Sequence, residues 1–369
     1  MYNKTTRQNK NKTIAFVIPS LDGGGMERVM SEVANYIATN TQTDCHLILY
    51  GKSREIFYEI SQDIKVYKPS FEFDDKRRQW MTVKTIKFIR STIRDIKPDS
   101  VLSFGEMWNS LVLLSLIGIK SPIYISDRSA PNVSHGRFQD YLRKALYPRA
   151  AGVIAQTYKA KELFKDQFYN KNVTVIGNPI REIKDTNSIK REKVIVSVGR
   201  LIKSKNFKRL IDIFHSVENK DWKLIIIGGD SNKQTNSLEL KQQINKLNLN
   251  DRVILAGTQK NVEKYLLRAS IFAFTSSSEG FPNVIGEAMS AGLPVIAYDC
   301  ISGPSDMIEN GKNGYLVPLF DDERFKNNLQ YLIDHKIERE LMGVYAKESI
   351  IRFSSEKICE QFYTFLSSK

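Results

Sequence analysis

Ile271-Phe272-Ala273-Phe274-Thr275 leads into the loop Ser276-Ser277-Ser278-Glu279-Gly280-Phe281-Pro282-Asn283, which continues as Val284-Ile285-Gly286-Glu287-Ala288-Met289. The first five residues have the apolar, aromatic composition of a buried strand, and the proline is well suited to the first turn of a helix. A strand followed directly by a helix is typical of a parallel sheet covered by helices. The loop amides and the positive helix end are then expected at the carboxyl edge of the sheet, where open α/β sheets bind ligands.

The same alternation of strand and helix extends through the chain. In the second half, the other expected strands are Val194–Val198, Lys223–Ile227, Val253–Ala256 and Pro294–Tyr298. In the first half, they are Ile14–Ile18, His46–Tyr50, Ser100–Ser103, Ile123–Ser126, Val153–Ala155 and Val173–Ile176, with expected helices at Met26–Ala38, Trp80–Ile96 and Phe138–Leu146. This pattern predicts an α/β protein with two Rossmann-like domains, each built on a parallel sheet.

The length of 369 residues also favours two domains over one. We expect an N-terminal domain at residues 1–180 and a C-terminal domain at residues 190–350. The linker is expected to begin at Gly177-Asn178-Pro179 and to run through a polar stretch to Lys193. Residues 351–369 are expected to form an amphipathic helix that can pack back on the N-terminal domain.

The composition, 41% hydrophobic and 26% charged, is that of a globular protein. The longest apolar run, Leu111–Ile119, is about half of the ~18–20 residues that a membrane span requires. The start, Met1–Lys12, is polar and basic and lacks the apolar core of a signal peptide, which predicts a cytoplasmic protein. Three cysteines and four histidines are scattered without metal-binding spacing, and no DxD triplet is present, so we expect no metal site.

The net charge of +14 is uneven. Residues 1–180 carry 27 Lys and Arg against 17 Asp and Glu, or +10, which leaves +4 for the rest. A basic half indicates an anionic partner, such as a phosphorylated substrate, an anionic membrane surface or a nucleic acid, although a merely basic surface explains the charge equally well.

Two segments of the second half carry charged groups suited to a sugar diphosphate. Glu279 in the loop and Glu287 in the following helix can accept hydrogen bonds from two sets of hydroxyls, such as those of a hexose and a ribose. Arg200 and Lys205 follow Gly199 at the end of a strand, and two cations before a helix can clamp a diphosphate. The turn Ser302-Gly303-Pro304 offers amides to the same edge, although, taken on its own, an ordinary tight turn is the preferred explanation.

In the first half, Gly23-Gly24-Gly25-Met26-Glu27-Arg28 follows the first strand. It lacks the GxGxxG spacing of a dinucleotide site. Its glycines allow close approach of the backbone to a ligand, and the helix that follows supplies positive polarity.

Together these segments resemble glycosyltransferase family 4, which has the two-domain GT-B architecture. Glu279 and Glu287 match the family's Glu-x7-Glu element, and Gly199, Arg200, Leu201, Lys205 and Asn206 match its Gly-Arg-Leu…Lys-Asn element. The Ser302-Gly303-Pro304 turn and the run from Asn313 to Pro318 match as well.

The resemblance implies a role for each matched residue. Glu279 and the amides of Gly280 and Phe281, in the donor-binding loop that includes Pro282 and Asn283, would hold the donor sugar, and Glu287 the ribose. Arg200 and Lys205 would neutralise the leaving diphosphate, and Gly24 and Gly25 would face the donor phosphates across the cleft between the domains. It also implies retention of anomeric configuration, with no cofactor and no metal.

One position departs from the family. The family usually places a histidine near the sugar after a later strand of the first domain, and the matching residue here is Arg128. Arg128 is therefore included among the candidate catalytic residues, as a group that binds substrate phosphate or the acceptor. His135, seven residues on, is the alternative to the missing histidine.

The stretch from Lys76 to Lys97 predicts a basic amphipathic helix. Its expected core face consists of Ile86, Ile89, Ile93 and Ile96, and Trp80, Met81 and Phe88 are further apolar residues. Its basic residues are Lys76, Arg77, Lys84, Lys87, Arg90 and Arg94. Such a helix can rest on an anionic leaflet or grip a lipid-linked phosphate, or it can be a solvated face.

The sequence therefore favours a retaining glycosyltransferase at the inner face of a bacterial plasma membrane. It would move a hexose or N-acetylhexosamine from a nucleotide sugar, with UDP as the expected nucleotide, to a lipid-linked saccharide or surface-polysaccharide acceptor. The alternatives are an isomerase of the UDP-N-acetylglucosamine 2-epimerase type and a catalytically silent subunit that binds a partner transferase. A nucleic-acid binder accounts for the charge but not for the loop and helix that carry Glu279 and Glu287, so no nucleic-acid partner is expected.

Overall fold

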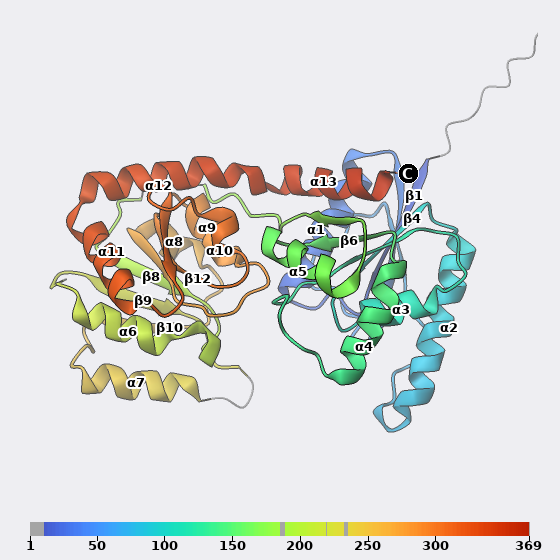
Figure 1. The fold of residues 1–369 in the computed structure, drawn as a ribbon, viewed down its shortest axis with the longest axis horizontal. Helices are drawn as coiled ribbons and strands as arrows, with labels where there is room; N and C mark the ends of the chain where they lie inside the picture. The colour runs from blue at the N-terminus through green and yellow to red at the C-terminus, as the bar shows by residue number, and fades with distance from the viewer. Residues whose placement is uncertain (1–10, 185–188, 219, 232–234, 369) are drawn as a thin grey trace, which may run out of the picture. The chain divides into compact units, whose positions relative to one another are not determined.

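The computed structural model describes residues 11–184, 189–218, 220–231 and 235–368 (Figure 1). Most of the basic start, Met1–Lys12, and residues 185–188 of the expected linker lie outside these ranges. The chain forms two compact units. The N-terminal unit comprises Met1–Pro179 and Glu356–Lys369, and the C-terminal unit comprises Ile180–Ser355.

The N-terminal unit is built on a parallel seven-stranded sheet in the order β3-β2-β1-β4-β5-β6-β7. Its strands are Lys12–Ile18 (β1), Thr43–Leu49 (β2), Ile64–Tyr67 (β3), Ser100–Phe104 (β4), Ile123–Ser126 (β5), Gly152–Ala155 (β6) and Val173–Val175 (β7). Its α-helices are Gly25–Asn40 (α1), Arg78–Ile96 (α2), Asn109–Ser115 (α3), Arg137–Leu146 (α4), Tyr158–Phe168 (α5) and Ser355–Ser367 (α13).

The C-terminal unit is built on a parallel six-stranded sheet in the order β10-β9-β8-β11-β12-β13. Its strands are Val194–Val198 (β8), Lys223–Ile227 (β9), Val253–Gly257 (β10), Ile271–Phe274 (β11), Val295–Asp299 (β12) and Gly314–Pro318 (β13). Its α-helices are Phe207–Ser216 (α6), Asn236–Lys246 (α7), Glu263–Arg268 (α8), Asn283–Ser290 (α9), Pro304–Met307 (α10), Asp322–Asp334 (α11) and Lys336–Ile350 (α12). Short 3₁₀ turns lie at Asp75–Arg77, Tyr147–Arg149, Lys203–Lys205 and Ile351–Phe353.

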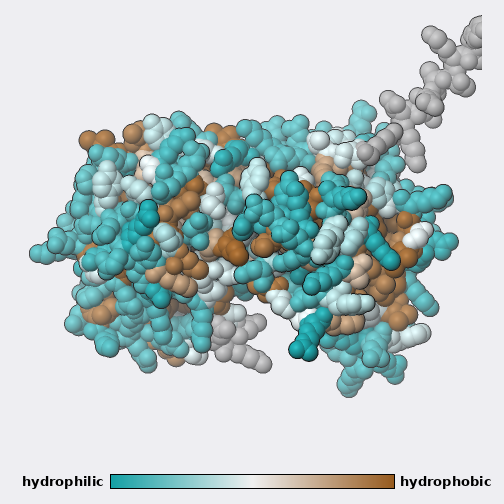
Figure 2. Space-filling model, viewed as in Figure 1, coloured by the Kyte–Doolittle hydropathy of each residue, from teal (hydrophilic) through white to brown (hydrophobic). Residues whose placement is uncertain are grey.

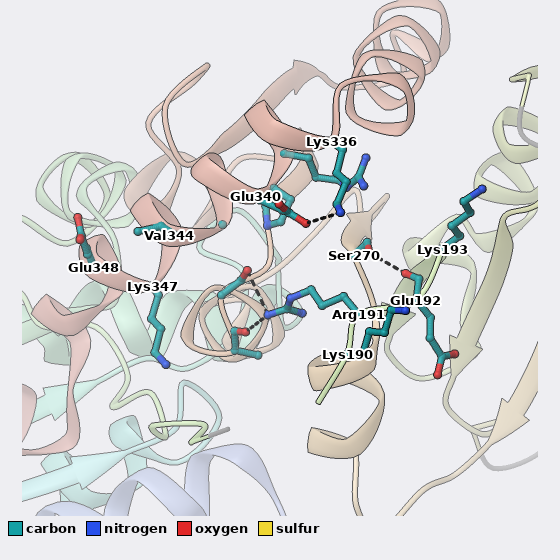
Figure 3. Close-up of a pocket in the computed structure, with 15 residues that line it drawn as sticks. Lys190, Arg191, Glu192, Lys193, Ser270, Lys336, Glu340, Val344, Lys347 and Glu348 are labelled. Atoms are coloured by element: carbon teal, nitrogen blue, oxygen red, sulfur yellow. Dashed lines mark hydrogen bonds and ion pairs between the residues drawn. The ribbon is translucent and has the colours of Figure 1, made fainter. Parts of the chain in front are cut away.

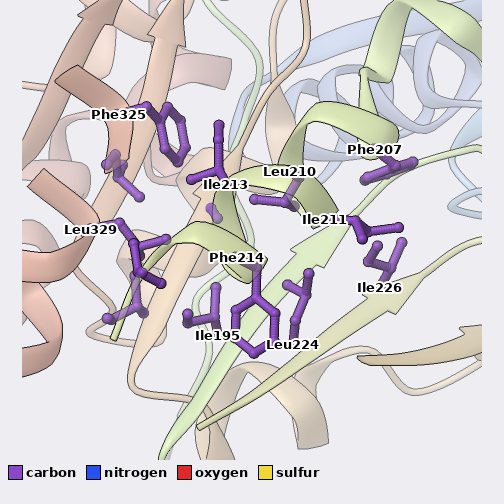
Figure 4. Packing of buried hydrophobic residues seen from close by; sticks show 14 of the residues in the cluster. Ile195, Phe207, Leu210, Ile211, Ile213, Phe214, Leu224, Ile226, Phe325 and Leu329 are labelled. Atoms are coloured by element: carbon purple, nitrogen blue, oxygen red, sulfur yellow. The ribbon is translucent and has the colours of Figure 1, made fainter. Parts of the chain in front are cut away.

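The core of the C-terminal unit is divided between the two faces of its sheet. Successive side chains of a strand point to opposite faces, so Ile195 packs with Leu210 and Phe214 of α6, whereas Val196 packs on the side of α9 and α12. Figure 4 shows the first of these clusters, where Phe214 lies beside Ile195 and Leu224. In Figure 1, α6 and α7 follow one side of this sheet and α12 follows the other. Burial on both sides explains why these strands are continuously apolar.

The N-terminal sheet is covered in the same way. Val101 of β4 packs against the face that carries Ile89 and Ile93 of α2. Phe104, which points to the opposite face of β4, contacts Phe362 of α13, with ring centroids 5.9 Å apart. The terminal helix therefore contributes apolar side chains to the core of the N-terminal unit.

In both sheets the strand order reverses at one place, between β1 and β4 in the first and between β8 and β11 in the second. Loops that leave two such neighbouring strands diverge to opposite faces and leave a crevice at the carboxyl edge, where doubly wound sheets bind ligands. The fold class predicted from the sequence, two Rossmann-like domains with parallel sheets, is confirmed.

Some elements differ from the expectations. The sequence pattern did not indicate β3, a four-residue edge strand, or β13, whose residues Gly314–Pro318 had been read only as a motif. The helices α3 and α5 were also missed. Part of the apolar run Leu111–Ile119 lies in α3. This helix was missed because burial between a sheet and its neighbours makes a helix apolar on most sides, and this conceals the helical periodicity.

No helix within the described ranges is long and apolar enough to cross a membrane. Figure 2 shows a mostly hydrophilic surface in that view, with hydrophobic residues gathered in small patches. Scattered apolar residues of this kind are normal on protein surfaces.

Candidate functional site

An ion pair joins the two loops that follow β8 and β11, the neighbouring strands at which the order of the C-terminal sheet reverses. The Nζ atom of Lys205, in the loop after β8, donates to Oε1 of Glu279, in the loop after β11. The two side chains are 15% and 14% exposed, so the pair is partly shielded from water. Two residues 74 positions apart, predicted separately from two motifs, therefore meet at the switch point of this sheet.

The backbones of these loops are also bonded to each other. The carbonyl oxygen of Ser204 accepts a hydrogen bond from the amide of Ser277 at 2.8 Å, and the hydroxyl of Thr275 donates to the carbonyl of Lys205 at 2.8 Å. Asn206 adopts a left-handed conformation (φ 52°), which Asn tolerates better than most residues. Its side-chain amide donates to the carbonyl of Thr275 at 2.9 Å. Of the two residues that match the family's Lys-Asn element, Lys205 therefore forms the ion pair, and Asn206 links the two loops.

Close backbone packing explains the glycines beside this site. A Cβ atom at Gly228, after β9, would lie 1.8 Å from the carbonyl oxygen of Gly199. A Cβ atom at Gly199 would lie 3.3 Å from the aliphatic chain of Lys205, which therefore passes over this glycine. The next residue, Arg200, is exposed, and its guanidinium makes no hydrogen bond or ion pair with any residue that the structure describes. Arg200 is consequently accessible to an anion from solvent.

The loop that ends at α9 is supported by the turn after β12. The hydroxyl of Ser302 donates to the carbonyl of Gly280 at 2.9 Å. A Cβ atom at Gly303 would lie 2.1 Å from Cδ of Pro282, so only glycine fits there. Phe281 is buried against Phe353, with ring centroids 5.6 Å apart. The turn that the sequence had left as an ordinary one is thus a structural support of the Glu279 loop.

The helix α9 begins one residue later than expected, because Pro282 is its N-cap and Asn283 its first residue. Glu287 lies in the second turn and lines a cavity of about 390 Å³ together with Lys260, from the loop after β10, and Arg181. Neither of these cations was singled out in the sequence. Lys260 could have been found, since it follows a predicted strand at the same edge of the sheet.

In the N-terminal unit, Gly24 is the N-cap of α1 and Gly25 its first residue. The carbonyl of Gly24 accepts a hydrogen bond from the hydroxyl of Tyr58 at 2.8 Å. A Cβ atom at Gly24 would lie 2.1 Å from Oε2 of Glu27, so the glycine allows this carboxylate to fold back over the loop. Burial is the largest cause that raises the pKa of Glu27 above its ordinary value, with a further contribution from Asp22.

Arg128 lies after β5 in the N-terminal unit. Its guanidinium stacks 3.9 Å from the ring centroid of Phe104 and 5.6 Å from that of Phe362, and donates to Oδ1 of Asn178 at 2.7 Å. Its Nε and Nη2 atoms are buried without a hydrogen-bond partner among the described residues. Burial lowers the pKa of this guanidinium, and Glu106 and Asp127 oppose that shift. Within the described ranges, His135 makes no hydrogen bond to Arg128.

The basic helix is only partly as expected. Met81, expected as an additional apolar residue, is buried with Ile89 and Ile93, whereas Ile86 and Ile96 are only partly buried. Arg90 donates to the carbonyls of Ser115 and Ile117. Lys84 lies over the rings of Phe71 and Trp80, at 5.7 and 5.9 Å. The exposed cations on α2 and the short turn before it are Lys76, Arg77, Arg78, Lys87 and Arg94.

A cavity of about 820 Å³ lies at the opposite edge of the C-terminal sheet, where Lys193, Ser270 and Pro294 precede its strands (Figure 3). Arg191 points into it and donates to several backbone carbonyls, including those of Ala269 at 2.7 Å and Ala291 at 2.5 Å. Beside it, Lys336 pairs with Glu340. Arg191 and Lys336 are therefore already paired within the protein. No cluster of His, Cys, Asp or Glu able to hold a metal ion is found in the part of the chain that the structure describes.

Comparison with known proteins supports a transferase. Residues 179–349 match the family described as glycosyl transferases group 1. The amylovoran biosynthesis glycosyltransferase AmsD of Erwinia amylovora is 29% identical over 361 residues, which cover 94% of this chain and 97% of AmsD.

A second relative is the GalNAc-alpha-(1->4)-GalNAc-alpha-(1->3)-diNAcBac-PP-undecaprenol alpha-1,4-N-acetyl-D-galactosaminyltransferase of Campylobacter jejuni. It is 25% identical, over 96% of this chain and 98% of its own.

Among solved structures, Anabaena Alr3699/HepE in complex with UDP superposes with a TM-score of 0.78 at 20% identity, over 97% of this chain and 100% of HepE. This likeness concerns the fold. The family match covers the segment that carries Glu279, Glu287, Arg200 and Lys205. The chain is therefore a glycosyltransferase with the two-domain GT-B fold.

Proposed function

We propose that this chain is a retaining transferase of family 4 type that moves a hexose or N-acetylhexosamine from a UDP-sugar to a lipid-linked saccharide or surface-polysaccharide acceptor. The observation that carries the proposal is the ion pair between Lys205 and Glu279 at the switch point of the C-terminal sheet. A cation suited to phosphate and a carboxylate suited to sugar hydroxyls lie there in direct contact. The donor would bind the C-terminal unit and the acceptor the N-terminal unit.

The chemistry of glycosyl transfer suits these residues. Breaking the bond between the anomeric carbon and the phosphate oxygen builds negative charge on the diphosphate and positive charge on the sugar. Cations fixed beside the leaving group are therefore most valuable in the transition state. Lys205 and the exposed Arg200 would neutralise the diphosphate, while Glu279 and the amides of Gly280 and Phe281 would hold the sugar.

The identity of donor and acceptor rests on the relatives. UDP is bound in the superposed HepE structure, and the Campylobacter relative is named for a donor sugar of the N-acetylhexosamine class. The name of that relative also gives an undecaprenol-linked diphosphate saccharide as its acceptor, and AmsD is named for the biosynthesis of a polysaccharide. These names support a bacterial glycan pathway. A place at the cytoplasmic face of the membrane is part of our proposal.

The role of Glu287 in donor binding gives a direct test. A charge-assisted hydrogen bond from the ribose to this carboxylate would contribute about 1.5–3 kcal/mol, so Glu287→Ala should raise the Kd for UDP about tenfold to 150-fold. Calorimetric titration of UDP measures this change. Glu338→Ala, an exposed acid of α12, is the control and should bind UDP like the wild type. Unchanged affinity in Glu287→Ala would remove the ribose assignment.

The exposed cations of the α2 region support peripheral binding to an anionic membrane. Each Lys or Arg near such a surface contributes on the order of 1 kcal/mol, and salt screens the attraction with a Debye length of about 8 Å. Reversing Arg77, Arg78, Lys87 and Arg94 to Glu should therefore abolish flotation with anionic liposomes, and raising the salt concentration should weaken flotation of the wild type.

The control for flotation reverses four exposed lysines of the C-terminal unit: Lys208, Lys223, Lys241 and Lys246. This variant carries the same change of net charge and should float almost as the wild type does. Equal loss of flotation in both variants would show that net charge rather than the α2 region governs binding. Flotation of the α2 variant at wild-type level would show that this face is merely solvated.

A further inference from the structure

The helix α12 carries large apolar residues on its outer face as well as on its inner face. Its inner face packs into the core of the C-terminal unit through residues such as Met342 and Ala346. A surface helix normally presents polar residues on its other side. Instead, α12 exposes four large apolar side chains: Ile337 (78% exposed), Leu341 (49%), Val344 (52%) and Tyr345 (37%).

These four residues form one outer stripe. They recur at intervals of three and four residues, which places them on one side of the helix. The helix α13 shows the usual arrangement in the same chain, since its buried residues are apolar and its exposed residues are all polar. Single exposed apolar residues are normal, whereas a contiguous group of them marks a contact surface. The outer stripe therefore indicates a partner that covers α12.

Opposite charges border the outer stripe on one side. Glu340 and Lys347 are seven residues apart, or about two helical turns. Both line the cavity of Figure 3 together with Val344, so they project from the same side of α12. Lys347 makes no hydrogen bond or ion pair within the ranges that the structure describes, and Glu340 makes an exposed pair with Lys336 at 3.7 Å. Exposed pairs of this kind contribute little, so both charges are available to a partner.

This arrangement is complementary to itself. In a two-fold symmetric pair the same surface of each copy meets, and two helices that face each other across the axis can run antiparallel. An axis midway between Glu340 and Lys347 places Glu340 of each copy opposite Lys347 of the other. The axis also passes beside Val344, within the outer stripe. One symmetric contact would thus bury both outer stripes and form two ion pairs.

The charges of α12 argue against an anionic membrane as the partner. Its exposed charged residues are two lysines and three glutamates, or −1 in total: Lys336, Lys347, Glu338, Glu340 and Glu348. Helices that lie on anionic leaflets are instead rich in Lys and Arg on their polar face. A second copy of the chain offers both signs of charge at matching places.

We propose that two copies of this chain associate through the outer stripes of α12 as an antiparallel pair, bordered by two ion pairs between Glu340 and Lys347. The inference concerns assembly and does not depend on the proposed transfer reaction. The cavity beside α12 lies at the edge of the C-terminal sheet opposite to the donor loops, so the pairing does not use those loops. One helix face is smaller than the roughly 800 Å² per partner of a standard interface, so we expect a dissociation constant in the micromolar range.

Sedimentation velocity of the full chain over a range of micromolar concentrations should show a monomer that converts to a dimer. Glu340→Lys and Lys347→Glu each bring like charges together at both ion pairs, so each variant alone should remain monomeric. An equal mixture of the two variants should form the dimer again, because one copy then carries a lysine at both positions and the other a glutamate at both. Restoration by mixing requires that the two positions meet across the interface.

Two further variants separate the outer stripe from general effects of charge. Leu341→Asp places a charge within the stripe and should remain monomeric. Lys241→Glu, at an exposed lysine of α7 in the same unit, makes the same change of charge as Lys347→Glu and should dimerise as the wild type does. The replaced side chains are all exposed, so each variant should keep the melting temperature of the wild type.

Four results would overturn the assignment: a wild type that stays monomeric at every concentration, single charge variants that dimerise as the wild type does, a mixture that stays monomeric, or a Leu341→Asp variant that still dimerises. A monomeric wild type whose flotation with anionic liposomes is lost in Leu341→Asp would assign the outer stripe to a membrane instead of a second copy.

Discussion

Replacement of Lys205 by alanine should lower the turnover number for the donor by about 10²–10³-fold, the range seen when one group that stabilises transition-state charge is removed. The Nζ atom of Lys205 is held by Glu279 and the chain passes over Gly199, so the cation is fixed before the donor arrives. A fixed cation needs little reorganisation as charge develops on the diphosphate. The effect should therefore appear in kcat more than in donor affinity.

A coupled assay of UDP release at saturating donor measures this loss. Lys203→Ala is the matched control, because Lys203 lies in the same short 3₁₀ turn but is exposed and is not paired with Glu279. It should keep nearly full activity. If Lys205→Ala also kept wild-type turnover while remaining folded, the leaving-group role of Lys205 would be refuted.

A second large effect is expected on stability rather than activity. Asp127 is 2% exposed and accepts hydrogen bonds from Arg143 at 2.5 Å, Tyr147 at 2.7 Å and Asn109 at 2.9 Å. Burial raises the pKa of this carboxyl, and Arg143 opposes that shift. Asp127→Ala would remove the close, buried counter-charge of Arg143 and leave only the carboxylate of Asp140, 3.9 Å away. Breaking a buried pair in this way costs about 3–5 kcal/mol of unfolding free energy.

Urea unfolding followed by tryptophan fluorescence measures this change, and Trp80 and Trp108 report on the N-terminal unit. The control is Glu162→Ala, which breaks the exposed pair between Lys159 and Glu162 in the same unit. Exposed pairs contribute at most about 1 kcal/mol. A loss of less than about 1 kcal/mol in Asp127→Ala as well would show that the network does not hold this part of the unit together.

The sequence predicted most of the fold because its central strands are buried on both faces and read as continuous apolar runs. Val194–Val198 and Lys223–Ile227 have the predicted bounds. The edges were harder to predict. Lys65 and Val66 of β3 are exposed, and Lys65 interrupts its apolar pattern. The bounds of β13 were hidden in a stretch rich in glycine and asparagine, which resembles a loop.

The sequence could predict which residues belong to the candidate site, but it could not predict which of them contact each other. The sequence motifs indicated Lys205 and Glu279, whereas their pairing depends on the order of β8 and β11 in the sheet. The surroundings of Arg128 depend on Phe362, far away in the sequence on the terminal helix. No local pattern reports such a contact.

The central claim is that this chain cleaves a UDP-sugar with retention at the site of Lys205 and Glu279. The most direct measurement is NMR of the full chain incubated with UDP-glucose, UDP-galactose, UDP-N-acetylglucosamine and UDP-N-acetylgalactosamine, read before the released sugar mutarotates. The account predicts that at least one donor yields UDP and, at first, the α-anomer of its sugar by slow transfer to water. Absence of turnover with all four donors, initial formation of the β-anomer, or release of a sugar inverted at C2 would contradict it.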